Sequence, residues 1–164
     1  MADIGQLEVV GASELPADYQ TLLAHDDHMT VAVEAFFGSL VDVRVLEERR
    51  EDLLYRRTSL LVCQSNGQIV QFGCICLDMA MVSDAVRREI ESRQTPLGRV
   101  LIRHNVLRRV ELRRLWRITP GPVLCEHLRI ETPAAGQPPF IYGRTARIVV
   151  ENCPAARLLE IVKV

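Results

Sequence analysis

The sequence predicts one α+β domain over residues 1–164, with about six antiparallel strands and helices collected on one face of the sheet. Runs that alternate apolar and polar residues fall into two groups, and helical patterns lie before the first group and between the two. A length of 164 residues suits a single core, and no repeat or domain break interrupts the pattern.

Two helices are expected near the N-terminus. Pro16 opens the first, over Leu15–Ala24, and Thr30 caps the second, over Val31–Phe37. Gly38 follows directly and predicts the end of the second helix.

Three strands and two further helices come next. Leu40–Arg50 alternates as a half-buried strand does. Arg57–Gln64 and Gln68–Leu77 are joined through an Asn-Gly pair, which is a strong hairpin signal. The segment Ser83–Arg93 has a helical pattern, and Thr95-Pro96 is typical of the start of another short helix.

The C-terminal part returns to strands. Val106–Ile118 has apolar residues at most of its even positions, and a short strand is expected over Val123–Ile130. The last two runs, Phe140–Val150 and Arg157–Val164, are separated by residues 152–154 and predict an antiparallel hairpin.

The composition excludes several classes of function. A formal net charge of −1 gives no overall attraction to nucleic acid or membrane, and no stretch is long and apolar enough to span a bilayer. Five cysteines without a Cys-x-x-Cys pair indicate neither a disulfide framework nor a zinc cluster. The N-terminus lacks a signal-peptide pattern, so we expect a cytoplasmic protein. The common hydrolase, kinase and dehydrogenase motifs are absent.

Glu160 is the most informative residue, because it shares a strand face with Leu158 and Val162. That face is expected to be buried. A buried carboxylate must be protonated, paired with a cation or met by a polar ligand, since leaving it charged and alone costs on the order of several kcal/mol.

Two arginines can supply the cation. Arg144 faces the apolar side of the preceding strand, and the hairpin can present it beside Glu160. Arg57 opens an earlier strand and would complete a pocket for a small dicarboxylate. The alternatives are a purely structural salt bridge for Arg144 and Glu160 and a surface position for Arg57.

A metal site is a weaker hypothesis. His25 and His28 are spaced so that two imidazoles can share one helix turn, but they lie in a connection and no third ligand has a motif of its own. We therefore expect no metal, and polar residues in such a connection usually face water.

Five short pieces, in this order, resemble the chorismate pyruvate-lyases, which make 4-hydroxybenzoate, and the wider chorismate lyase-like group. The pieces are residues 22–30, 55–62, 95–99, 142–145 and 158–160. The sequence departs from the family where His28 replaces a serine, where Phe72-Gly73-Cys74 stands in place of a Gly-Arg pair, and where residues 143–145 replace a double arginine.

The resemblance implies a small ligand buried beneath helical flaps and an elimination of pyruvate from chorismate that needs no metal and no cofactor. It assigns catalysis to Arg57, which would clamp a carboxylate, and to Glu160, which would bind the ring hydroxyl. The implied substrate-binding residues are Met29, Thr30, Leu97, Gly98 and Arg144. Chorismate and 4-hydroxybenzoate are then the expected small-molecule partners.

The alternative function is a non-catalytic domain that binds another small aromatic or carboxylate ligand. Ligand-sensing domains of some bacterial transcription regulators resemble the same fold and bind effectors without catalysis. About 20 residues precede the first matching piece, too few for a helix-turn-helix domain, so we expect the lyase.

Overall fold

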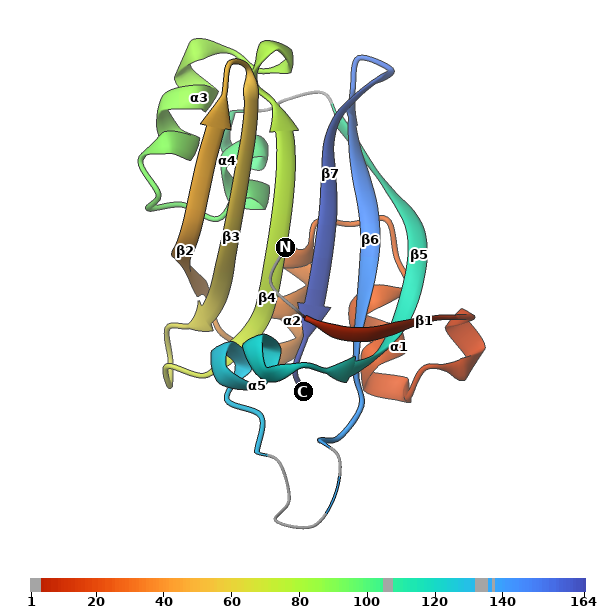
Figure 1. Cartoon of the computed structure of the whole chain (residues 1–164). Helices are drawn as coiled ribbons and strands as arrows, with labels where there is room; N and C mark the ends of the chain where they lie inside the picture. The colour runs from red at the N-terminus through yellow and green to blue at the C-terminus, as the bar shows by residue number, and fades with distance from the viewer. Residues whose placement is uncertain (1–3, 105–107, 132–135, 137) are drawn as a thin grey trace.

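Seven antiparallel strands form one sheet in the order β1-β5-β6-β7-β4-β3-β2 (Figure 1). The structure is a computed structural model that describes residues 4–104, 108–131, 136 and 138–164. The strands are β1 Gly5–Val10, β2 Val41–Glu51, β3 Leu54–Cys63, β4 Ile69–Asp78, β5 Arg108–Pro120, β6 Ile141–Val150 and β7 Cys153–Val162. The helices of these residues are α1 Ala17–Leu23, α2 Met29–Phe37, α3 Asp84–Glu91, α4 Leu97–Arg103 and α5 Pro122–Leu128. The predicted single α+β domain is confirmed.

The sheet consists of two three-stranded meanders joined at its centre, with β1 added at the edge beside β5. One meander is β2-β3-β4, the other is β5-β6-β7, and β4 pairs with β7 between them. This central pairing sets Gly73 opposite Glu160, and the neighbouring pairing of β6 with β7 sets Arg144 opposite Glu160. The predicted C-terminal hairpin therefore has the register that its alternation requires.

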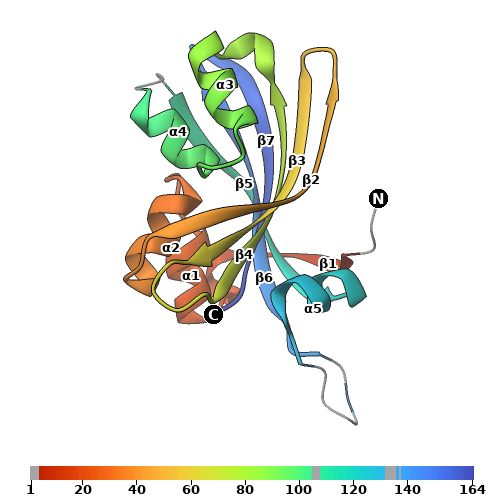
Figure 2. The same cartoon turned by 90° about the vertical axis from the view of Figure 1, so that its left-hand side faces the viewer.

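Helices α1 to α4 lie on one face of the sheet, and α5 lies on the other (Figure 2). The helix-covered face carries two apolar clusters. One surrounds α3 and α4 and includes Val86 and Leu101, and the other surrounds α1 and α2 and includes Leu22 and Val33. Two separate clusters on one face leave room between them for a site.

The helix and turn signals are accurate to within a few residues. The helix expected over Val31–Phe37 begins at Met29 with His28 as N-cap, so Thr30 lies in the first turn and caps nothing. It ends at Gly38, whose φ of 61° suits glycine. The expected hairpin between β3 and β4 turns through Gly67, which has a φ of 72°.

The short strand expected over Val123–Ile130 is wrong, because this segment forms α5. Pro122 stands at the first helical position after Gly121, where its missing N–H is no loss. Leu124 and Leu128, one helical turn apart, are both fully buried against the face of the sheet opposite α1 to α4.

The sequence pattern missed β1 and shifted β5. Gln6–Val9 of β1 alternate polar and apolar residues over only four positions, and all four side chains are exposed in this edge strand, which pairs with β5 through its backbone. The strand expected over Val106–Ile118 is β5, and Val106 lies outside the described residues.

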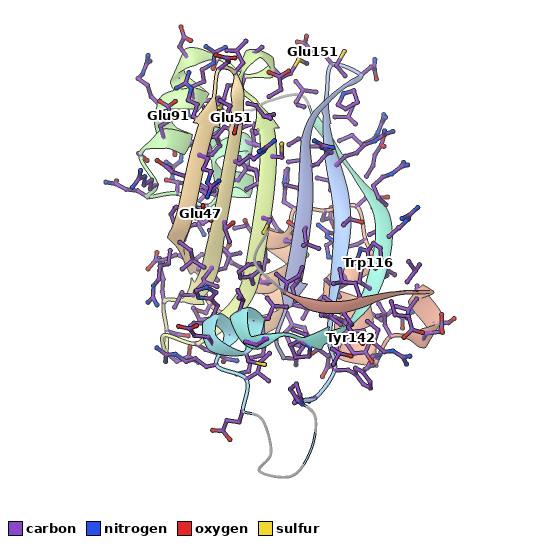
Figure 3. The ribbon with its side chains drawn as sticks, viewed as in Figure 1. Glu47, Glu51, Glu91, Trp116, Tyr142 and Glu151 are labelled. Atoms are coloured by element: carbon purple, nitrogen blue, oxygen red, sulfur yellow. The ribbon has the colours of Figure 1, made fainter. Side chains whose placement is uncertain are left out.

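At the opposite edge, β2 carries charged side chains. Figure 3 shows Glu47 and Glu51 along this strand and Glu91 on the neighbouring α3. Arg50 of β2 forms an ion pair with Glu91. Charges on an edge strand oppose its pairing with another chain. In the described part of the chain, no helix is long and apolar enough to cross a membrane.

Candidate functional site

A small cavity lies between the sheet and the helices, in the gap between the two apolar clusters. It offers about 60 Å³ to the centres of water molecules, room for roughly four waters or a small organic group. Its floor comes from β3, β4 and β7, and its roof comes from the start of α2 and the start of α4. The polar residues in the lining are His28, Thr30, Arg57, Ser59, Gln71, Cys74 and Glu160.

Arg57 of β3 lines this cavity with only 3% of its surface exposed. Nε and Nη1 of its guanidinium are out of the reach of water and have no hydrogen-bond partner among the described residues. An unmet buried donor costs about 1–3 kcal/mol, and more when the group is charged. The arrangement is therefore suited to an oxygen acceptor, preferably an anionic one.

The groups around Arg57 keep its charge only partly compensated. Burial lowers the pKa of Arg57, while the nearby Tyr55 hydroxyl and the Glu48 carboxylate oppose that change. The Tyr55 hydroxyl donates to Glu48 Oε2 at 3.0 Å, and Glu48 also forms an ion pair with Arg93. Glu48 is thus already engaged at the protein surface by two other groups.

Arg144 of β6 is completely buried, and every contact of its guanidinium is internal. Nε donates to Glu160 Oε2 at 2.7 Å, and Nη1 and Nη2 each donate at 2.8 Å, to the carbonyl oxygens of His25 and Asp27. Arg144 therefore fastens the connection between α1 and α2 to the sheet and pairs with Glu160. It does not line the cavity.

The roof depends on a close approach between α2 and α4. A Cβ atom added to Gly98 would lie 2.8 Å from Thr30 Oγ1, too near for any larger residue without a shift. Met29 and Leu97 supply the apolar part of the roof. His28 lines both this cavity and a wider hollow of about 720 Å³ beside β5.

The structure brings six of the seven predicted site residues to one cavity. These are Met29, Thr30, Arg57, Leu97, Gly98 and Glu160, while Arg144 lies behind Glu160. The sequence reasoning missed Gln71, which is 6% exposed, lines the cavity and has a side-chain oxygen without a partner. Alternation along β4 places Gln71 on the face of Ile75 and Leu77, and that signal could have found it.

The histidine pair does not form a metal site in this structure. His25 Nε2 contacts the Leu22 carbonyl oxygen at 2.7 Å, and its Nδ1 accepts from the Asp27 backbone N–H at 3.1 Å. Both ring nitrogens are thus engaged by the local backbone. Within the described ranges, no group of three or more His, Cys, Asp or Glu side chains is placed to hold a metal ion.

Solved bacterial proteins share this fold at low sequence identity. PhnF from Mycobacterium smegmatis aligns with a TM-score of 0.59 and 11% identity, over 85% of this chain and 64% of PhnF. The ligand-binding domain of a putative GntR-family transcriptional regulator from Bordetella bronchiseptica gives 0.56 and 13%, over 75% of this chain and 85% of that domain. The possible transcriptional regulator YydK from Bacillus subtilis subsp. subtilis str. 168 gives 0.51 and 10%, over 75% and 57%.

These matches show the fold alone. The chain spans less than two thirds of PhnF and of YydK. No protein-family model and no curated protein matches the sequence. The fold is the chorismate lyase-like fold, as the resemblance implied.

The expectation that this chain is an enzyme is wrong. The solved structures that share the fold are described as a possible transcriptional regulator and as the ligand-binding domain of a putative one, which points to effector binding rather than to catalysis. The residues expected to act in catalysis fit this correction. Glu160 is held by Arg144, and two nitrogens of the buried Arg57 guanidinium have no acceptor among the described residues, an arrangement that binding explains without any reaction.

Proposed function

We propose that this domain binds a small anionic molecule in the cavity beneath α2 and α4 and acts as an effector-sensing domain. The observation that carries the proposal is the buried guanidinium of Arg57, two of whose nitrogens have no acceptor in the part of the chain that the structure describes. A bound anion would supply oxygen acceptors for a desolvated charge, and such hydrogen bonds are worth about 1.5–3 kcal/mol each.

The remaining lining suits an organic ligand. Met29, Leu97 and Leu158 offer apolar contacts, and Thr30 and Ser59 add hydroxyl groups. Ligand sites of this kind combine mostly apolar walls with a few fixed polar groups. The ligand-binding domain from Bordetella bronchiseptica shares the fold and supports a binding function for this chain.

Chorismate and 4-hydroxybenzoate belong among the first carboxylates to assay, because the resemblance implies them as ligands. If either of them binds, its affinity should depend on Arg57, as for the other carboxylates. The proposal also expects chorismate to be recovered unchanged, with no release of pyruvate above the rate in buffer.

The test compares Arg57→Met with Arg56→Met. Arg56 is the next residue on β3, points away from the cavity and keeps about half of its side chain exposed. Calorimetry with a panel of aromatic and aliphatic carboxylates should find anions that bind the wild type and Arg56→Met alike. Arg57→Met should bind the same anions about 10- to 100-fold more weakly.

Two results would contradict the proposal. One is a panel in which no anion binds the wild type. The other is an anion that binds Arg57→Met as tightly as the wild type, since its site would then lie elsewhere.

A further inference from the structure

A second buried polar group in the cavity lacks a hydrogen-bond partner, as Arg57 does, but it is an acceptor and not a donor. Gln71 of β4 is 6% exposed, and its Oε1 is out of the reach of water and without a hydrogen-bond partner in the described ranges. Arg57 has unmet donors and Gln71 has an unmet acceptor. The two side chains line one cavity and yet do not satisfy each other.

The strand register explains why they stay apart. Arg57 pairs with Ile75, and Gln71 lies four residues away along β4, opposite Leu61. Four residues of strand span about 13 Å. Between them, Ser59 pairs with Gly73, whose lack of a side chain leaves the floor open there. The Gln71 side chain leans over this gap, with Nε2 3.4 Å from where a Cβ of Gly73 would stand.

The charges around the cavity also restrict the ligand. The Arg144–Glu160 pair is internally compensated, and Arg57 carries the remaining positive charge of the lining. A ligand with a single negative charge balances this charge. A doubly charged ligand would leave an uncompensated anion in a buried site, which is costly.

We propose that Gln71 is the specificity-determining residue of the site and selects a monoanion that carries a hydrogen-bond donor away from its anionic group. The anionic oxygens bind Arg57, and a hydroxyl or amino hydrogen at the far end donates to Gln71 Oε1. This inference rests on the anion-binding function proposed above and adds the second recognition group of the ligand.

The donor requirement is expected to be strong, because a buried acceptor that loses its partner is left with its full desolvation cost. A ligand that carries the donor should bind about 10- to 100-fold more tightly than the matched ligand without it. Sites built around a buried polar group discriminate in this way against analogues that cannot pair with it.

Matched ligand pairs test the inference by calorimetry. Benzoate is compared with 3- and 4-hydroxybenzoate, propionate with 3-hydroxypropionate, and a phosphate monoester is included as a dianion. Each ligand is titrated into the wild type, Gln71→Met and Gln68→Met. Gln68 is exposed in the turn before β4 and serves as the matched control.

The wild type and Gln68→Met should prefer the hydroxylated member of at least one pair, and Gln71→Met should lose that preference while still binding the unhydroxylated member. Urea unfolding of each variant verifies that it is folded.

If anions bind through Arg57 but both members of every pair bind equally, the role of Gln71 is refuted and the anion site stands. If no anion binds, both proposals fail. Tighter binding of the dianion would refute the requirement for a single charge.

Discussion

Arg144 and Arg57 are two arginines buried on the same face of one sheet, and their surroundings differ completely. Arg144 has an internal acceptor for each of its three nitrogens, whereas Nε and Nη1 of Arg57 have none within the described residues. Burial alone therefore does not distinguish a structural arginine from a binding one. The difference lies in whether the fold itself supplies the acceptors.

The comparison assigns opposite energetic roles to the two side chains. Removing a satisfied member of a buried ion pair strands its partner, which is strongly destabilising. Removing an unsatisfied buried cation relieves a desolvation cost.

The largest effect is expected from Arg144→Met. This change leaves the Glu160 carboxylate buried without its cation and removes donors from the carbonyls of His25 and Asp27. We expect a loss of about 3–5 kcal/mol in the free energy of unfolding, measured in urea. Arg147→Met, on the same strand but in a partly exposed pair with Glu111, should lose less than about 1 kcal/mol. If the two variants lost the same free energy of unfolding, the buried pair of Arg144 would contribute no more to stability than the partly exposed pair of Arg147.

The double variant Arg144→Met/Glu160→Met is expected to recover part of that loss. It removes both ends of the ion pair, so no buried charge is stranded, and well-packed apolar replacements of buried pairs are often tolerated. A coupling energy of about 1–3 kcal/mol should separate the double variant from the sum of the single ones. Strict additivity would mean that the two groups do not interact in solution. The double variant should still lose some free energy of unfolding, because the carbonyl oxygens of His25 and Asp27 remain without their donor.

Much of this contrast was predictable from the sequence, because the period of two along a strand is a local property. Alternation placed Arg144 and Glu160 on apolar faces, and the short turn at residues 150–153 fixes the pairing of their strands. The facing of Arg57 follows from the same rule.

The satisfaction of Arg144 was not predictable, because the acceptors that its Nη1 and Nη2 meet at 2.8 Å are backbone carbonyls more than 100 residues away in the chain. Carbonyl groups are the same in every residue, so no pattern of side chains marks which of them will meet a guanidinium. For a similar reason, β1 was missed: its stability comes from backbone pairing with β5, which its mostly exposed side chains do not reveal.

A smaller effect of opposite sign is expected from Arg57→Met without ligand. The change removes a buried guanidinium with two unmet donors and keeps an unbranched apolar chain of similar length. The free energy of unfolding should stay the same or rise by up to about 1–3 kcal/mol. An anion at about 100 times its wild-type Kd should then stabilise the wild type by about 2.7 kcal/mol and Arg57→Met, which binds it 10- to 100-fold more weakly, by only about 0.4–1.4 kcal/mol. A loss of several kcal/mol without ligand would show that the fold needs this charge.

The smallest effect is expected at the surface end of the Arg57 surroundings, where Arg93 pairs with Glu48. The hydrogen bond from Arg93 is the main reason that the pKa of Glu48 lies below its ordinary value of 4.5 in the folded protein, and burial opposes this lowering. A carboxyl whose pKa is lower in the folded state stabilises the fold fully above its unfolded value. That contribution is lost as the pH falls through the lower folded value.

Arg93→Gln should therefore be slightly less stable than the wild type at pH 7, and urea unfolding at pH 7, 5, 4 and 3 should show the two proteins converging in acid. Because the Arg93 end of the pair is exposed to solvent, added salt should also reduce the difference. If the difference in free energy of unfolding between the two proteins stays constant from pH 7 to pH 3, the stabilisation by Arg93 does not depend on the charge of Glu48.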